Sequence, residues 1–379
     1  MKPRLVILTE IISPYRIPLF NALARSRRVD LHVIFLAETD PTLRQWKVYK
    51  GEIEFSYEIL PSRRVGLGRH QALLNRGVAR ALAGFTPDVI LCGGYNYLAS
   101  WQALGWARKH GVPFLLWSES TLLDRRRSLF PVEFLKRKFI AACSGFVVPG
   151  ESAREYLSAH GIKPDRITQA PNAVDNALFA AAAARARADE HRVREDLNLP
   201  EHYFLYVGRL VPDKGVFELL SAYAKLDDSM RSQVGLVLVG DGAARAKLEQ
   251  QAASISPSRI LFPGFAQRER LGAYYALAEA QVLPTYTDTW GLVVNEGMAC
   301  GLPVILSSVA GCAADLVRDG GNGFLVPPGD VEALARAMKH IVWEPALRLA
   351  MSASSIERIR AYSPEEWCRG ILEVLDKNF

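Results

Sequence analysis

The sequence predicts an α/β protein made of two doubly wound domains. Short apolar segments of strand length alternate with helical segments in both halves of the chain, which is typical of a parallel sheet with helices on both faces. The 379 residues suffice for two hydrophobic cores, and the composition changes at 171–175, where Pro-Asn-Ala-Val-Asp precedes an Ala- and Arg-rich segment. We therefore expect one domain over 1–172 and a second over 173–362, with a C-terminal helix over 363–379 that packs back on the first.

Six apolar segments of the first half are expected to be strands, with helices between them. The strands are Leu5–Leu8, Leu31–Leu36, Val89–Cys92, Phe114–Trp117, Phe146–Val148 and Ile167–Ala170. The helices are Ile17–Ala24, Gln71–Ala83, Leu98–His110 and Ser152–His160. The aperiodic segment 38–69 is expected to be a mobile loop or an irregular hairpin. Ligands of open parallel sheets bind beyond the carboxyl ends of the strands, which singles out the loops 9–16 and 118–124.

The most informative stretch of the second half is a strand, a polar turn and a helix. The apolar segment 280–283 reads as a buried strand, and 292–299 has helical character that ends at Cys-Gly-Leu-Pro. Asp288 therefore lies at the mouth of this helix and Glu296 within it, roughly 12 Å apart along the axis. The unpaired N–H groups at a helix mouth suit a phosphate, so one acid would lie on each side of a bound diphosphate. The alternative is an ordinary strand-turn-helix with surface acids.

Other segments of the second half continue the alternation. The strand 204–207 leads into a loop that carries Arg209 and Lys214. Further strands are expected at Val237–Val239, Val304–Leu306 and Phe324–Val326. An Ala- and Arg-rich helix is expected over 180–194, and three helices end the chain, the last of them at Pro364–Asp376.

Composition and charge exclude several classes of protein. With 49% hydrophobic and 23% charged residues, the profile is that of a soluble globular protein, and no apolar run approaches the roughly 18 residues of a membrane span. Glu10 interrupts the N-terminal apolar run, which favours a buried first strand over a signal peptide. Five scattered cysteines without a C-x-x-C spacing favour buried free thiols in a reducing cytoplasm. No helix-turn-helix, zinc-finger spacing or RNA-binding signature supports a nucleic-acid partner.

Positive charge is concentrated in the first half. Through Asp175 the chain holds 25 Lys and Arg against 15 Asp and Glu, a balance of +10, so the remainder carries −4 of the total of +6. The bases Arg125–Arg127 and Lys136–Lys138 flank the apolar residues Leu129, Phe130, Phe134 and Leu135. Such a run is usually a solvated charged face, but it also suits a helix that lies on an anionic membrane.

The stretch Asp-Thr-Trp-Gly-Leu-Val-Val-Asn-Glu-Gly-Met-Ala-Cys-Gly-Leu-Pro-Val at 288–304 resembles the donor-binding motif of retaining glycosyltransferases of family 4, which have the GT-B fold. The Gly-Arg…Lys-Gly loop at 208–215, the Gly-Asp-Gly turn at 240–242 and the Gly-rich turn at 319–323 also resemble family motifs. The first half resembles the family only weakly. Three departures stand out: Asp288 occupies a position that is usually Glu, the first loop lacks glycine, and no histidine lies near Glu119.

The resemblance implies a GT-B protein with two Rossmann-like domains facing a central cleft. It implies transfer of a sugar from a UDP- or GDP-type donor with retention of configuration, in bacterial-type polysaccharide, O-antigen or glycolipid assembly. The implied catalytic residues are Arg209 and Lys214, which would stabilise the departing diphosphate, and Glu119, which would contact the acceptor or the sugar. The implied donor-binding residues are Gly208, Asp288, Gly291, Leu292, Val293, Glu296 and Phe265. Phe265 would contact the nucleobase, or would instead belong to the core.

No metal or other cofactor is expected. The sequence contains no Asp-x-Asp pair, so Arg209 and Lys214 would balance the diphosphate charge. The expected partners are a nucleotide-sugar donor, a lipid-linked or saccharide acceptor and an anionic membrane surface, which places the protein in the cytoplasm or on the inner face of the cell membrane. Two alternatives remain. One is a nucleotide-sugar epimerase of GT-B-like fold, and the other is a non-catalytic sugar-nucleotide-binding protein, which Asp288 and the missing histidine favour.

Overall fold

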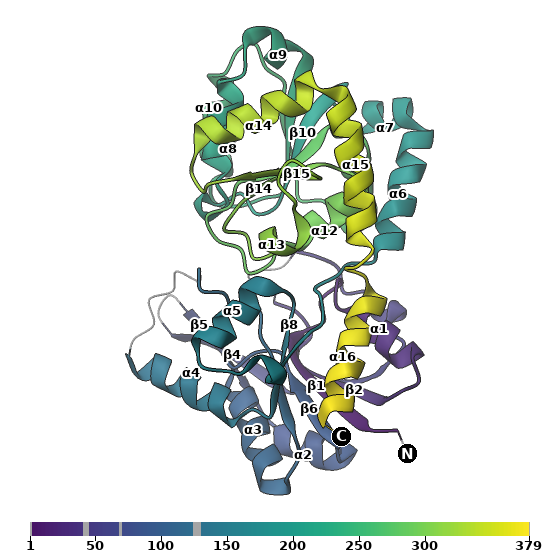
Figure 1. Ribbon diagram of the computed structural model, residues 1–379, viewed down its shortest axis with the longest axis vertical. Coiled ribbons are helices and arrows are strands. Elements are labelled where there is room, and N and C mark those ends of the chain that lie inside the picture. Colours follow the sequence, from purple (N-terminus) through teal and green to yellow (C-terminus); the bar gives the residue numbers. More distant parts are fainter. Residues whose placement is uncertain (1, 41–44, 68–69, 124–129, 379) are drawn as a thin grey trace. The chain divides into compact units, whose positions relative to one another are not determined.

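The computed structural model describes residues 2–40, 45–67, 70–123 and 130–378 (Figure 1). The chain divides into two compact units. Unit 1 comprises Met1–Val174 and Pro364–Phe379, and unit 2 comprises Asp175–Ser363. The sequence had placed these divisions at 172/173 and 362/363.

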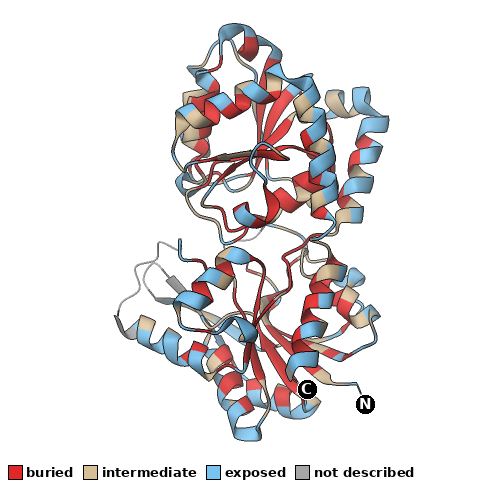
Figure 2. Cartoon of the chain, viewed as in Figure 1, coloured by how far each residue is buried: buried red, intermediate tan, exposed pale blue. Residues whose placement is uncertain are grey.

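Unit 1 is a parallel seven-stranded sheet with the order β3-β2-β1-β6-β7-β8-β9. Successive residues of β1 face opposite sides: Leu5 and Ile7 belong to one buried cluster, and Val6 and Leu8 to another. Helices therefore cover both faces of a sheet whose central strands are largely buried, as Figure 2 shows, whereas the edge strand β3 is only partly buried. The strands are β1 (Arg4–Ile11), β2 (Asp30–Ala37), β3 (Ser56–Ile59), β6 (Val89–Cys92), β7 (Phe114–Trp117), β8 (Gly145–Val148) and β9 (Ile167–Gln169). The helices are α1 (Ile17–Arg25), α2 (Val78–Phe85), α3 (Leu98–His110), α4 (Phe130–Ala142), α5 (Glu151–Ala159) and α16 (Pro364–Asn378), with short 3-10 turns η1 (Lys50–Glu52) and η2 (Pro164–Arg166).

One expected helix of unit 1 is wrong in its first part. Residues 71–75 belong to strand β5 (His70–Asn75), which pairs antiparallel with β4 (Ser62–Leu67), and helix α2 begins only at Val78. Pairing with a distant strand overrides the local helical pattern. Asn75 fixes the end of the hairpin, because its buried side-chain amide donates to the carbonyl of Leu36 at 2.6 Å. The segment 38–69, expected to be a loop or hairpin, thus contains η1, β3 and one hairpin strand in its described part.

Helix α16 completes the core of unit 1. Trp367 is fully buried, and its ring lies 5.6 Å from that of Phe20 on α1 and 5.3 Å from that of Trp117 at the end of β7. Figure 1 shows α16 alongside α1. Helix α16 therefore packs against the end of β7, after which the loop that carries Glu119 begins.

Unit 2 is a parallel six-stranded sheet with the order β12-β11-β10-β13-β14-β15. The strands are β10 (His202–Val207), β11 (Val234–Val239), β12 (Ile260–Gly264), β13 (Ala280–Leu283), β14 (Val304–Ser307) and β15 (Gly323–Val326). The helices are α6 (Asn176–Ala188), α7 (Glu190–Leu197), α8 (Val216–Ala224), α9 (Asp228–Gln233), α10 (Arg245–Ala253), α11 (Arg268–Ala276), α12 (Leu292–Ala299), α13 (Ala313–Leu316), α14 (Val331–Trp343) and α15 (Pro345–Ile359), with η3 (Pro212–Lys214) before α8. The single helix expected over 180–194 is two helices, because Asp189 has non-helical backbone angles (φ −125°, ψ 42°).

The order of strands in unit 2 reverses at β10. The chain proceeds from β10 to β11 and β12 on one side and then returns to the other side of β10 with β13. The loops after β10 and β13 therefore leave the same edge of the sheet side by side, where open α/β sheets bind ligands. All five cysteines are buried and free, as expected. Among the described residues, no helix is both long and apolar enough to span a membrane.

Candidate functional site

Backbone contacts join the two loops at the switch point of unit 2. The N–H of Tyr286 donates to the carbonyl of Asp213 at 2.9 Å, and the hydroxyl of Thr285 donates to the same carbonyl at 3.1 Å. Gly215 ends the first loop with φ +68°, and a Cβ there would lie 2.0 Å from the carbonyl oxygen of Pro284. Only glycine permits both this backbone angle and this approach. The sequence thus fixes the β10 loop directly against the β13 loop.

This junction brings Lys214 and Asp288 together. The ammonium of Lys214 donates to Oδ2 of Asp288 at 2.5 Å and to the carbonyl of Thr287 at 3.2 Å. The two side chains are only 14% and 19% exposed. Oδ1 of Asp288 accepts the N–H of Trp290 at 3.2 Å. Both oxygens of this carboxylate therefore already have protein donors.

Arg209 supplies a second cation in the same loop. Arg209 is exposed, and its backbone carbonyl accepts a hydrogen bond from the hydroxyl of Tyr206 at 2.8 Å. Within the part of the chain that the structure describes, the guanidinium of Arg209 forms no ion pair or hydrogen bond. Gly208 precedes it at the end of β10. Lys214 is held in place, whereas the charge of Arg209 is available to a ligand.

Helix α12 begins four residues after Asp288, so its N-terminus lies close to the Lys214–Asp288 pair. Gly291, with φ +97°, is the N-cap residue, and no side chain caps the helix. Leu292 and Val293 form the first turn and are half-buried. The N–H groups of such a turn carry positive partial charge and bind anions well. The expected residues of the donor motif thus occupy a strand-loop-helix junction.

Glu296 lies one turn further along α12. Its carboxylate accepts the hydroxyl of Tyr275 on α11 at 2.8 Å. Burial raises the pKa of Glu296 to about 7, and the hydrogen bond from Tyr275 opposes this shift in part. A carboxyl group whose pKa is raised by burial, near a helix N-terminus without a side-chain cap, is a candidate functional group.

In unit 1, the loops after β1 and β7 meet through an ion pair. The guanidinium of Arg16 lies 2.5 Å from the carboxylate of Glu119 and donates to the side-chain oxygen of Asn172 at 3.2 Å. The same guanidinium stacks on the ring of Trp117 at 3.9 Å. Sequence reasoning singled out Glu119 and both loops but not Arg16 as its partner. The position of Arg16 at the end of the first loop was the only signal for it.

Family models match both units of this chain. The model described as "Glycosyltransferase Family 4" matches residues 19–178, and the model described as "Glycosyl transferases group 1" matches residues 187–358. A protein of Nocardiopsis dassonvillei named D-inositol 3-phosphate glycosyltransferase is 30% identical over 329 residues, which are 82% of this chain and 75% of the relative. The chain belongs to glycosyltransferase family 4. A protein of the same name from Streptosporangium roseum is 34% identical over 221 residues, 55% of this chain, and there the match spans about half (49%) of the relative's length.

Solved structures show the GT-B fold for this family 4 chain. The Anabaena protein Alr3699/HepE in complex with UDP superposes with a TM-score of 0.74 at 20% identity, covering 99% of this chain and 100% of that one. Sucrose-phosphate synthase from Thermosynechococcus elongatus gives a TM-score of 0.74 at 22% identity, covering 100% and 99%. At these identities the likeness concerns the fold alone, which is the two-domain GT-B fold predicted from the sequence.

Phe265, the candidate nucleobase contact, lies on the surface of unit 2. Phe265 follows β12 directly and is 43% exposed. The interpretation of Phe265 as a core residue is therefore wrong, and its ring remains accessible for stacking.

Helix α4 carries three of the predicted bases, but Asp124–Leu129, with Arg125–Arg127, lie outside the described residues.

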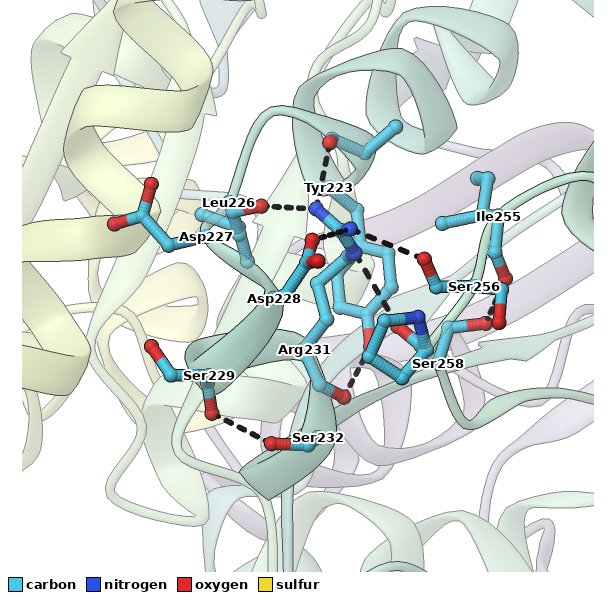
Figure 3. Close-up of polar contacts among 12 residues, drawn as sticks. Tyr223, Leu226, Asp227, Asp228, Ser229, Arg231, Ser232, Ile255, Ser256 and Ser258 are labelled. Carbon is cyan, nitrogen blue, oxygen red and sulfur yellow. Dashed lines mark hydrogen bonds and ion pairs between the residues drawn. The ribbon is translucent and has the colours of Figure 1, made fainter.

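A second polar cluster in unit 2 is structural. Arg231 on α9 is 9% exposed and donates to the carbonyls of Ala224 at 2.9 Å, Pro257 at 3.2 Å and Ser256 at 3.2 Å (Figure 3). It also donates to the carbonyl of Leu226 and pairs with Asp228. With so many protein acceptors, this guanidinium joins three chain segments and does not hold a ligand. In the described ranges, no three His, Cys, Asp or Glu side chains converge in a group suited to a metal ion.

Proposed function

We propose that the protein transfers a sugar from a nucleoside diphosphate sugar, of the UDP or GDP type, to an acceptor with retention of configuration. The observation that carries this proposal is the placement of Arg209 and Lys214 in one loop, beside the uncapped N-terminus of α12, at the switch point of the sheet of unit 2. When the bond between sugar and phosphate breaks, negative charge develops on the leaving diphosphate. Positive groups fixed near that charge lower the barrier to transfer.

The two cations complement each other. Arg209 offers a planar fork for two phosphate oxygens, and Lys214 offers a compact charge that the protein already holds in position. Because these side chains supply the positive charge, we propose that transfer requires no metal ion. Activity that survives a chelator such as EDTA is the expected result.

Each of the remaining donor-binding residues is proposed to contact a different part of the nucleotide. Glu296 accepts the ribose hydroxyls, and the exposed ring of Phe265 contacts the base. The backbone at Gly208 and at 291–293 borders the phosphates, and Asp288 belongs to the same motif. The Anabaena neighbour was crystallised with UDP, which makes uridine nucleotides the first donors to test.

We further propose that the acceptor is a glycolipid or a lipid-linked saccharide of polysaccharide or O-antigen assembly, reached from an anionic membrane surface. The support is one face of α4, where Phe134 and Leu135 are each 50% exposed beside the exposed bases Arg137 and Lys138. Exposed aromatic and aliphatic side chains among bases suit the interface of an anionic bilayer. In unit 1, Glu119 and its partner Arg16 are proposed to contact the acceptor.

Incubation with UDP-sugars and GDP-sugars labelled in the sugar tests the proposal. Transfer of label to an added acceptor, or slow release of free sugar, is the expected result. Membrane lipid extracts and D-inositol 3-phosphate serve as parallel acceptors, since the relatives are named for the latter. An isomerised donor would instead indicate an epimerase. An unchanged donor, with nucleotide still bound, would indicate a non-catalytic binding protein.

A further inference from the structure

Asp288 is enclosed by protein groups. Its Oδ2 accepts the ammonium of Lys214, and its Oδ1 accepts the N–H of Trp290. Its backbone is fixed as well, since the carbonyl of Asp288 accepts the N–H of Gly311 at 2.9 Å. With 19% of the side chain exposed, little of the carboxylate faces solvent.

The neighbours of Asp288 are themselves fixed. Trp290 is 3% exposed, and its indole N–H donates to the side chain of Asn295 at 2.9 Å. Lys214 is largely covered, and apart from Asp288 its ammonium donates to the carbonyl of Thr287. A ligand group that displaced the ammonium from the carboxylate would leave a half-buried Lys214 without its charge partner, which costs free energy.

We infer that Asp288 acts on the donor through Lys214, as a positioning residue, and does not itself bind the donor sugar. The inference rests on the proposed function, since it assumes that Lys214 faces the diphosphate. An ammonium has three N–H donors, and Thr287 and Asp288 accept two of them. Among the described residues the third N–H has no acceptor, so it remains available to a ligand.

Binding of UDP and UDP-glucose tests the inference. Calorimetric dissociation constants are measured for the unaltered protein, for Asp288→Asn, for Lys214→Met and for the double variant. Asn retains the size of Asp and an oxygen for the Trp290 N–H but loses the charge. Loss of the Asp288 charge has two opposite effects on nucleotide affinity. It releases Lys214 from its fixed position, and it removes a negative charge beside the diphosphate. The informative quantity is therefore the coupling of the two residues rather than the sign of either change.

The expected result has two parts. Asp288→Asn changes the dissociation constants of UDP and UDP-glucose by the same factor, about threefold or more, and this factor shrinks to near one when Lys214 is already Met. If Asp288 binds the sugar, UDP affinity stays constant, UDP-glucose affinity falls, and the loss persists in the Lys214→Met background; that pattern overturns the inference. If the unaltered protein binds neither UDP nor GDP, the proposed function fails together with it.

Asp330→Asn is the matched control. Asp330 caps α14 in the same unit by accepting the N–H of Ala333 at 2.9 Å, and within the described ranges it forms no hydrogen bond or ion pair with Lys214. This variant loses a charge at a helix start, as Asp288→Asn does, but should leave both dissociation constants within twofold of the unaltered values. An equal effect of the two variants would show that the change at Asp288 is a general structural one and would overturn the inference.

Discussion

Lys214 and Asp288 are 74 positions apart in the sequence, yet their side chains form an ion pair of 2.5 Å. The pair exists because β10 and β13 are neighbours in the sheet, with Phe204 opposite Ala280. The loops after β10 and β13 leave the sheet at the same edge, and the close approach of Gly215 to the carbonyl of Pro284 brings them into direct contact. The geometry of the candidate donor site therefore depends on a backbone contact as much as on charged side chains.

Substitution of Gly215 tests that backbone contact. We expect Gly215→Ala to lower the free energy of unfolding by about 3 kcal/mol, because it combines left-handed backbone strain with a clash against Pro284. Gly320→Ala is the control in the same unit, since Gly320 has a similar φ of +72° but no atom within 4 Å of the added Cβ. Its cost should be about 1 kcal/mol. Equal costs in urea unfolding would mean that the loops are not closely packed.

Glu296→Gln tests the ribose contact. Above pH 7, where Glu296 is mostly ionised, a hydrogen bond to a charged group contributes about 1.5–3 kcal/mol, so the variant should bind UDP or GDP at least tenfold more weakly. The matched probe is the 2′,3′-dideoxy nucleotide, which lacks the hydroxyls and should bind the variant and the unaltered protein equally. An equal loss for both nucleotides would place Glu296 away from the ribose.

The raised pKa of Glu296 also predicts how stability depends on pH. The folded protein keeps the proton on Glu296 up to about pH 7, whereas the unfolded chain loses it near 4.5. The native state thus binds more protons between these values, so this group lowers stability as pH rises from about 4.5 to 7. Glu296→Gln removes the effect, and its stability relative to the unaltered protein should rise over this range by at most about 3 kcal/mol. A difference independent of pH would contradict the shift.

Local patterns predicted most strands of this protein. Buried parallel strands are largely apolar, so Val89–Cys92, Phe114–Trp117 and Ala280–Leu283 were predicted with their observed bounds. The helix predicted over 71–83 was wrong in its first part because 62–67 pairs with 70–75, and pairing of that kind is not a local property.

The sequence predicts candidate residues for the site but not the contacts that hold them. The motif supplied Arg209, Lys214, Asp288 and Glu296, but the partners Trp290 and Tyr275 depend on how α11, α12 and the β13 loop pack. Likewise, burial sets the pKa of Glu296, and burial emerges only from the folded unit. Arg16 was missed because its role follows from the neighbouring loop that carries Glu119.

Vesicle co-sedimentation tests the proposed membrane face of α4. Each base near an anionic leaflet contributes about 1 kcal/mol, so Lys138→Ser should weaken vesicle binding about fivefold at low salt. Adding Phe134→Ser to this variant should weaken vesicle binding further. Arg80→Ser, a change of equal charge on an exposed residue of α2, is the control. Replacement of Arg125–Arg127 by Ser tests the adjoining bases. No binding at low salt, or equal losses with Arg80→Ser, would contradict the membrane proposal and leave the transferase proposal intact.

The most direct test of the donor site is turnover at saturating donor for Arg209→Ala and Lys214→Ala. If these cations stabilise the departing diphosphate, each variant should lose about 10²-fold or more in turnover, the size expected when one group that stabilises developing charge is removed. Thermal unfolding of both variants checks that unit 2 remains folded. Variants that raise only the Michaelis constant and keep full turnover would show that the two cations bind the donor uniformly, which would contradict their proposed role in the transfer step.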